Sequence, residues 1–165
     1  MRRGMSAAFA AAAALFLNQA GADPPQLGPD SNLPVPRFVS LKVEGANGRH
    51  GPGLDHPVDW IYQRAGLPLQ VTGESGPWRR VVDPDGGEVW MHAQNLDARR
   101  TAYVTRASAL RRQAREGAQT IAYLDAGVIG ALTGCEGDWR RIAIAGRVGW
   151  VEAAALWGAP NCAGL

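Results

Sequence analysis

The nine residues TGESGPWRR at 72–80 return as TGCEGDWRR at 133–141, and six of the nine positions are identical. The two copies begin 61 residues apart, and further along Trp90 matches Trp150 at a spacing of 60. A repeat this dense indicates that the chain holds two copies of one small unit of about 60 residues. The two copies join near Arg99-Arg100.

Short stretches with strand character follow one another in both copies, separated by turn signals. They cover 37–43, 58–63, 67–73, 78–82 and 88–92, and then 101–105, 120–125, 127–134, 139–144 and 147–156. Closing a small sheet into a barrel removes its exposed edges. The sequence therefore predicts an all-β fold of two tandem small antiparallel β-barrels, and the short junction predicts that they pack on each other.

Two segments could be helical rather than extended. Residues 93–96 read as a single helical turn. Residues 108–119 permit a helix by composition, but their place in the repeat matches the turn-rich stretch 47–57, which favours a loop.

The N-terminal residues predict an export signal. Arg2 and Arg3 precede an apolar run at 6–17, and Ala20-Gly21-Ala22 is typical of a cleavage site, so 1–22 is read as a secretory signal peptide. Residues 23–36 contain five prolines and predict an extended, poorly ordered leader. The predicted units then cover 37–100 and 101–158, with a C-terminal tail at 159–165. The expected location is the periplasm or the exterior.

Charge argues against two classes of partner. Removing the signal peptide leaves 15 basic and 15 acidic residues. A chain with no net charge has no broad electrostatic footprint for nucleic acid or for an anionic membrane surface. The apolar run at the start is also too short for a stable membrane span.

The chain has only two cysteines, Cys135 and Cys162. In an oxidising compartment they are expected to form a disulfide bond. A bridge across these 27 residues would stabilise the fold by roughly 3–4 kcal/mol in the loop-entropy model. Two free thiols are the alternative.

Metal and catalytic chemistry find little support in the sequence. His50, Asp55, His56 and Asp59 crowd one glycine- and proline-rich stretch, whose spacing fits no regular metal site. Cys135 has no histidine in its own copy. Neither a nucleophile elbow nor a phosphate-binding loop occurs. We therefore expect neither an enzyme nor a bound metal or cofactor.

The motifs of both copies resemble one known family, the bacterial SH3-like (SH3b) domains. In the first copy the resemblance rests on ANGRHGPG (46–53), GPWRRV (76–81) and EVWMH (88–92). The second copy resembles a diverged member through GDWRRI (137–142) and GRVGWV (146–151). Gly48 departs from the family, which usually has an apolar residue there. The resemblance implies two SH3-like barrels in a non-catalytic binding module, which contacts peptidoglycan peptide or a periplasmic protein.

The Trp-Arg-Arg motif conflicts with a simple strand pattern. On a regular strand Trp78 and Arg80 share one face, while Arg79 and Val81 share the other, and neither face is cleanly apolar. Either a bulge after the tryptophan resets the alternation, or Trp78 lies half exposed with Arg80 stacked across its ring.

A ligand groove is one hypothesis for the aromatic residues of the first copy. Flat rings give contact area at little entropic cost, so an aromatic groove suits an extended ligand. The candidate ligand-binding residues are Trp60, Tyr62, Trp78, Arg80 and Trp90. The alternatives are that the tryptophans only cover the core, or that the protein is a structural or accessory subunit whose groove is filled by a partner or by its own leader.

Overall fold

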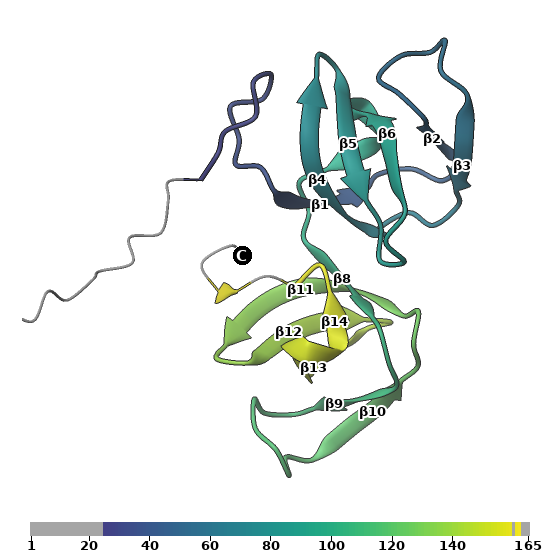
Figure 1. Ribbon diagram of the computed structural model, residues 1–165. Coiled ribbons are helices and arrows are strands. Elements are labelled where there is room, and N and C mark those ends of the chain that lie inside the picture. Colours follow the sequence, from purple (N-terminus) through teal and green to yellow (C-terminus); the bar gives the residue numbers. More distant parts are fainter. Residues whose placement is uncertain (1–24, 160, 163–165) are drawn as a thin grey trace, which may run out of the picture.

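The computed structural model describes residues 25–159 and 161–162. It consists of two sheet units that follow each other along the chain, and Figure 1 shows the first above the second. The predicted signal peptide at 1–22 and part of the predicted tail lie outside the described residues.

Unit 1 (37–97) is a seven-stranded sheet with a short 3-10 turn near its end. Its elements are β1 (Arg37–Leu41), β2 (Ala46–Arg49), β3 (Val58–Tyr62), β4 (Pro68–Ser75), β5 (Trp78–Val82), β6 (Glu88–His92), η1 (Ala93–Asn95) and β7 (Leu96–Asp97). The strand order is β3-β2-β6-β5-β4-β1-β7, and all its pairings are antiparallel.

Unit 2 (101–157) repeats this arrangement. Its elements are β8 (Thr101–Val104), β9 (Ser108–Arg111), β10 (Thr120–Leu124), β11 (Ile129–Glu136), β12 (Trp139–Ile144), β13 (Arg147–Glu152), η2 (Ala153–Ala155) and β14 (Leu156–Trp157). The order β10-β9-β13-β12-β11-β8-β14 corresponds strand by strand to that of unit 1. The predicted all-β fold and its internal repeat are therefore confirmed.

The structure also shows which of the two possible helical segments is helical. Residues 93–95 form the single 3-10 turn η1, whereas 108–119 form strand β9 and a following loop. Within the described part of the chain, no helix has the length and apolar character to span a membrane. Neither sheet shows a pairing between its two end strands within that part, so closure into a barrel stays a prediction.

A β-bulge explains the mixed pattern of the Trp-Arg-Arg strand, but it lies in the neighbouring strand. The register changes from Val71↔Val81 to Gly73↔Arg80, which leaves Thr72 of β4 as the extra residue. The same shift occurs in β11 of unit 2. The expected bulge after the tryptophan is thus misplaced, because β5 itself keeps a regular register with β6.

Each unit has its own apolar core. The core cluster of unit 1 consists of Leu41, Ala46, Leu67, Leu69, Val71, Val81, Val89 and Met91, and that of unit 2 of Val104, Leu110, Leu124, Ile142, Val151 and Ala155. The strand pairings make Gly48 equivalent to Leu110 and Val89 equivalent to Gly149. In unit 1 the glycine lies on the second strand and faces Val89 on the sixth. In unit 2 the positions are exchanged, so that Leu110 on the second strand faces Gly149 on the sixth.

The two units pack directly on each other, as the short junction predicts. Thr101 Oγ1 donates to the carbonyl of Gly66 at 2.7 Å, and Arg64 Nη2 donates to the carbonyl of Gly127 at 2.7 Å. Tyr103 and Ile129 of unit 2 lie against the core of unit 1. The arrangement of the two units is thus fixed by polar and apolar contacts together.

The described part of the leader is folded rather than extended. Leu27 and Pro34 form a β-bridge, and Gly28 N–H donates to the carbonyl of Leu33 at 2.8 Å. This turn lies beside unit 1 (Figure 1). The expectation of a poorly ordered leader is therefore corrected for 25–36. Proline content describes the isolated segment only, and it gives no information about contacts with unit 1 such as the hydrogen bonds from Ser31 to Glu74.

Candidate ligand groove

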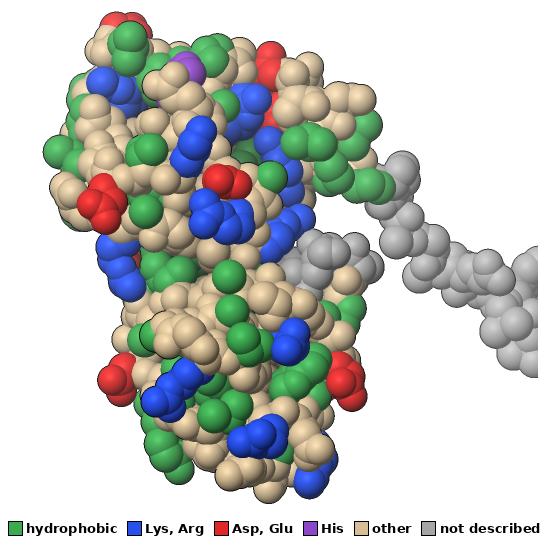
Figure 2. Space-filling view, turned by 180° about the vertical axis from the view of Figure 1, so that it is seen from behind, with side chains coloured by type: hydrophobic (Ala, Val, Ile, Leu, Met, Phe, Trp, Pro, Cys, Tyr) green, Lys and Arg blue, Asp and Glu red, His purple; other side chains and the backbone are tan. Residues whose placement is uncertain are grey.

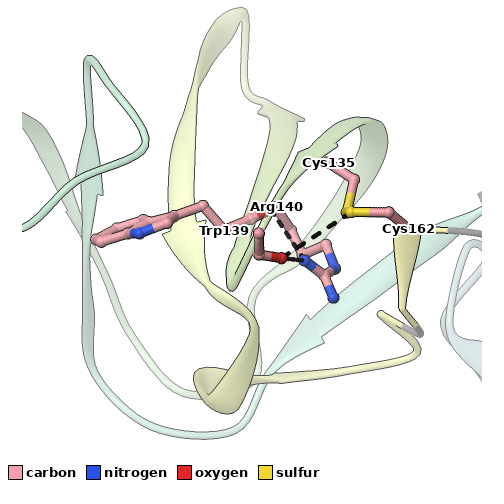
Figure 3. The surroundings of a disulfide bond; sticks show 5 residues. Cys135, Trp139, Arg140 and Cys162 are labelled. Carbon is pink, nitrogen blue, oxygen red and sulfur yellow. Dashed lines mark hydrogen bonds between the residues drawn. A yellow bond between two sulfur atoms is a disulfide. The ribbon is translucent and has the colours of Figure 1, made fainter.

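The first arginine of each Trp-Arg-Arg motif holds a hairpin turn. Arg79 Nη1 donates to the carbonyl of Gly76 at 2.7 Å and to that of the preceding tryptophan at 2.9 Å. Arg140 Nη1 makes the same pair of bonds, to Gly137 at 2.8 Å and to its preceding tryptophan at 3.0 Å (Figure 3). Both glycines have a positive φ, which an L side chain rarely adopts. The first arginine of each copy therefore holds its hairpin turn in place.

In unit 1 the same hairpin carries Glu74, whose carboxylate binds the leader. Its side chain is 0% exposed, and it accepts hydrogen bonds from Ser31 N at 2.9 Å, Ser31 Oγ at 2.6 Å and Asp30 N at 3.1 Å. Arg37 Nη2 lies at 2.8 Å and Arg79 Nε at 3.4 Å. Burial raises the pKa of this carboxyl, but the bonds from Ser31, Arg37 and Asp30 outweigh that effect and lower it to about 2.

In unit 2 the equivalent position is Cys135, which forms a disulfide bond with Cys162. The Cα atoms are 5.4 Å apart, within the ordinary range for a disulfide. Figure 3 shows the bond beside the hairpin of Arg140. The predicted disulfide is confirmed. It attaches the segment that follows unit 2 to the hairpin of that unit, as Glu74 attaches the leader to the hairpin of unit 1.

A groove of about 560 Å³ opens beside Trp78 and is called the unit 1 groove. Its lining residues are Val43, Gly45, Ala46, Asn47, Arg49, Leu54, Pro77, Trp78, His92, Gln94 and Asn95. Trp78 is only 8% exposed and meets the His92 ring edge-on, with centroids 5.3 Å apart. His92 Nδ1 accepts a hydrogen bond from Gln94 N at 3.3 Å. The groove therefore combines a fixed aromatic wall with several side-chain amides.

Unit 2 has a smaller groove at the equivalent place, with a volume of about 180 Å³. Its lining residues are Arg106, Ala107, Ser108, Ala109, Arg111, Trp139, Val151 and Glu152. Arg106 Nη1 donates at 2.9 Å to the carbonyl of Ala154, the residue equivalent to Gln94. A guanidinium thus lies where unit 1 offers open space and amides.

One arginine keeps the same task in both grooves. Arg49 Nη1 donates to the carbonyl of His56 at 2.7 Å, and Arg111 Nη1 donates to that of Ala118 at 3.1 Å. Each bond closes the long loop between the second and third strands of its unit. The groove walls in both units therefore rest on the same structural bond.

The chain contains two sequence matches to one family. The model of the bacterial SH3 domain matches residues 42–98 and again 105–158, one match within each unit. The chain belongs to the bacterial SH3 domain family. This confirms the resemblance drawn from the motifs, and units 1 and 2 are its two SH3 domains.

Other comparisons add little beyond the family. No curated protein matches the chain. Among solved structures, NlpC2 from Trichomonas vaginalis is similar with a TM-score of 0.35 and 14% identity over 74% of this chain. NlpC1 from the same organism gives a TM-score of 0.34 and 14% identity over 79% of this chain. In both cases the match covers 48% of the other protein, so this chain spans about half of its length.

Of the five predicted ligand-binding residues, only Trp78 lines the unit 1 groove. Trp60 lies on the end strand β3 and is 65% exposed. Tyr62 packs against the core, and its hydroxyl donates to Asp83 Oδ2 at 2.9 Å. Burial and this bond raise the pKa of Tyr62, which keeps the phenol protonated. The five predicted residues therefore do not line one common groove.

The remaining two predicted residues form a row across the sheet. Trp90 pairs with Arg80 on one side and with Arg49 on the other. Arg80 Nε donates to Thr72 Oγ1 at 3.2 Å and lies 3.7 Å from Glu88 Oε2. The predicted stacking of Arg80 on a half-exposed Trp78 is therefore wrong, because that indole is buried and the guanidinium is bonded elsewhere.

Sequence reasoning missed most residues of the unit 1 groove. Asn47 and Arg49 lie on β2, while His92 ends β6 and Gln94 lies in η1, so these residues meet only in the folded unit. One signal was available, because Arg49 and Arg111 recur at a spacing of 62.

A histidine and an aspartate of the histidine-rich stretch contact each other. His50 Nδ1 lies 3.4 Å from Asp59 Oδ2, with 78% of the His50 side chain and 35% of the Asp59 side chain exposed. Among the described residues no group of three or more His, Cys, Asp or Glu could hold a metal ion.

Proposed function

We propose that this chain is an exported, non-catalytic binding module, and that its unit 1 groove holds an extended peptide of the bacterial cell wall. The sequence supports export through its signal-like start, and a disulfide bond is typical of proteins in the periplasm or outside the cell. The closed SH3-like barrel of the sequence analysis is part of this proposal. The two cysteines are bridged, which supports a role without a thiol nucleophile.

The observation that carries the proposal is the open unit 1 groove. Its volume of about 560 Å³ falls in the range of ligand sites, roughly 300–1,000 Å³. Trp78 and Pro77 offer flat apolar surface, while Asn47, Gln94 and Asn95 offer amides that can both donate and accept. A peptide in extended form presents N–H and C=O groups to such amides and side chains to the apolar wall. Peptidoglycan stem peptides are the ligand class that this combination and the family favour.

A pelleting assay with purified sacculi tests the proposal. Asn47 is exposed on the groove wall, so Asn47→Trp should fill the groove without disturbing the core. We expect the wild-type protein to pellet with sacculi and Asn47→Trp to lose at least tenfold in affinity. The matched control is Ala109→Trp, which alters the equivalent position of the narrow unit 2 groove and should pellet normally. A wild-type protein that stays in the supernatant while an established sacculus-binding protein pellets would refute the proposal.

The alternative is an accessory subunit that binds a periplasmic protein. Val58, Trp60 and Ile61 on β3 are exposed apolar residues, which supports a protein-binding role for that end of the sheet. The described leader does not line the unit 1 groove, so the leader is not its occupant here. Co-purification of a stoichiometric partner that Trp60→Ser abolishes, together with no sacculus binding, would favour this alternative.

A further inference from the structure

A second groove, of about 710 Å³, lies between the leader and unit 1 and is called the leader groove. Its lining residues are Ser31, Leu33, Pro34, Pro36, Arg37, Phe38, Val39, Gln70, Arg79, Ala93, Leu96, Asp97, Ala98 and Arg100. Phe38 and Gln70 are cross-strand partners, while the flanking Leu69 and Val71 point into the core. The leader groove therefore lies on the outer surface of the sheet, and none of its residues lines the unit 1 groove.

The leader forms a fixed apolar wall of this groove. Leu33, Pro34 and Pro36 lie on it, and Leu33 is 50% exposed. Ser31, two positions earlier, is bonded to Glu74 through both its N–H and its hydroxyl. Figure 2 shows hydrophobic side chains on the leader beside a group of basic side chains of the upper unit. Because the wall is anchored, the groove exists before any ligand arrives.

The charges in the leader groove leave one cation without a partner. Arg37 and Arg79 both contact the buried Glu74 carboxylate, and Asp97 lies 3.3 Å from Arg99. Arg100 lines the groove and has no side-chain hydrogen bond or ion pair among the described residues. A guanidinium next to an apolar groove attracts a carboxylate, which it can bind through two parallel hydrogen bonds.

We propose that the leader groove binds an apolar monocarboxylate of the acyl type. The carboxylate pairs with Arg100, and the hydrocarbon chain lies over Phe38 against the leader wall. The apolar lining favours a ligand whose polar groups are confined to one end, because a buried polar group without a partner costs free energy. The volume again falls within the range of small-ligand sites. This site is independent of the proposed cell-wall peptide site.

Calorimetric titration of the purified protein with decanoate tests the proposal. We expect saturable binding with a stoichiometry of one. Arg100→Gln should weaken it at least tenfold, and decanol should bind wild type at least tenfold more weakly than decanoate. Leu33→Glu places a negative charge in the groove at an exposed position and should also abolish binding. Arg141→Gln is the matched control, because it removes an exposed arginine from unit 2 and should leave the affinity unchanged.

Three results would overturn the assignment. The first is the absence of saturable decanoate binding by wild type, and the second is equal affinity of wild type and Arg100→Gln. The third is loss of decanoate binding in Asn47→Trp, which would locate the ligand in the unit 1 groove. Unchanged decanoate binding by Asn47→Trp supports the proposal, whether or not that variant binds sacculi. The two proposals can therefore fail separately.

Discussion

Glu74 of unit 1 and Cys135 of unit 2 occupy the same position in the same bulged hairpin, yet they fasten the chain by different chemistry. Glu74 gathers hydrogen bonds and arginines around a buried carboxylate and holds the leader. Cys135 holds the segment after unit 2 through a covalent bond to Cys162. In both units the duplicated hairpin anchors a neighbouring segment of the chain. The anchor of unit 1 is sensitive to acid because it depends on a carboxylate, and the anchor of unit 2 is sensitive to reductant because it is a disulfide bond.

The largest expected effect comes from breaking the covalent anchor. Replacing both cysteines, as Cys135→Ser with Cys162→Ser, should lower the free energy of unfolding by about 3–4 kcal/mol, because the 27-residue loop is then open in the unfolded chain. Urea denaturation with and without dithiothreitol measures this. Reductant should bring wild type to the level of the variant and leave the variant unchanged; equal stability of oxidised wild type and variant would contradict the role of the bridge.

The acid-sensitive anchor should be lost as the pH falls. The pKa of Glu74 is about 2 in the folded protein, against roughly 4.3 for a free glutamate, so the unfolded chain takes up the proton first. The contribution is complete above about pH 5 and disappears between that value and about pH 2, and it amounts to roughly 3 kcal/mol. Urea titrations across this range should show a flatter profile for Glu74→Gln than for wild type. Glu136→Gln, at the exposed neighbour of Cys135, should retain the wild-type profile.

The two arginines of the unit 1 motif should differ in how much they contribute to the free energy of unfolding. Arg79→Ala removes the turn bonds and one partner of Glu74, and should cost roughly 2–3 kcal/mol. Arg80→Ala removes a half-exposed contact and should cost less than about 1 kcal/mol. Thermal or urea denaturation of the two variants side by side checks this. A larger loss for Arg80→Ala would mean that the second arginine has a structural task.

The exchanged glycines of the two cores offer a smaller test of their equivalence. A Cβ at Gly48 would lie 2.7 Å from Val89 Cγ2 and 2.8 Å from Tyr62 Cε2, so Gly48→Leu should destabilise unit 1 by about 1–3 kcal/mol. The double variant Gly48→Leu with Val89→Gly reproduces the residue pair of unit 2, in which Leu110 faces Gly149. We expect the double variant to recover part of the loss in a double-mutant cycle. Strict additivity of the two changes would contradict the exchange.

Much of the fold could be predicted from the repeat itself. The spacing of 61 residues located both units, and the turn residues located most strands. The bulge at Thr72 could not be placed, because it belongs to the partner of the Trp-Arg-Arg strand and only cross-strand pairing reveals it. Gly48 departs from the apolar residue that is usual in the family, and the reason appears only in the structure, where Val89 and Tyr62 occupy the space that a larger side chain would need.

The candidate site was harder to predict than the fold. An aromatic residue is visible in a sequence, but whether it lines a groove depends on its neighbours in space. Trp78 lines one, while Trp60 lies exposed on an end strand and Tyr62 packs on the core. The leader groove depends on the bond between Ser31 and Glu74, two residues that lie 43 positions apart.

The two units also differ in function in our account, because the unit 1 groove is open and Arg106 occupies the equivalent place in unit 2. Nuclear magnetic resonance titration with a soluble peptidoglycan stem peptide tests this difference most directly. We predict that shift changes cluster on the Trp78 indole, the Asn47 side-chain amide and their neighbours, and that the Trp139 indole stays unchanged. Shift changes centred on Trp139, or none at a saturating peptide concentration, would contradict the account.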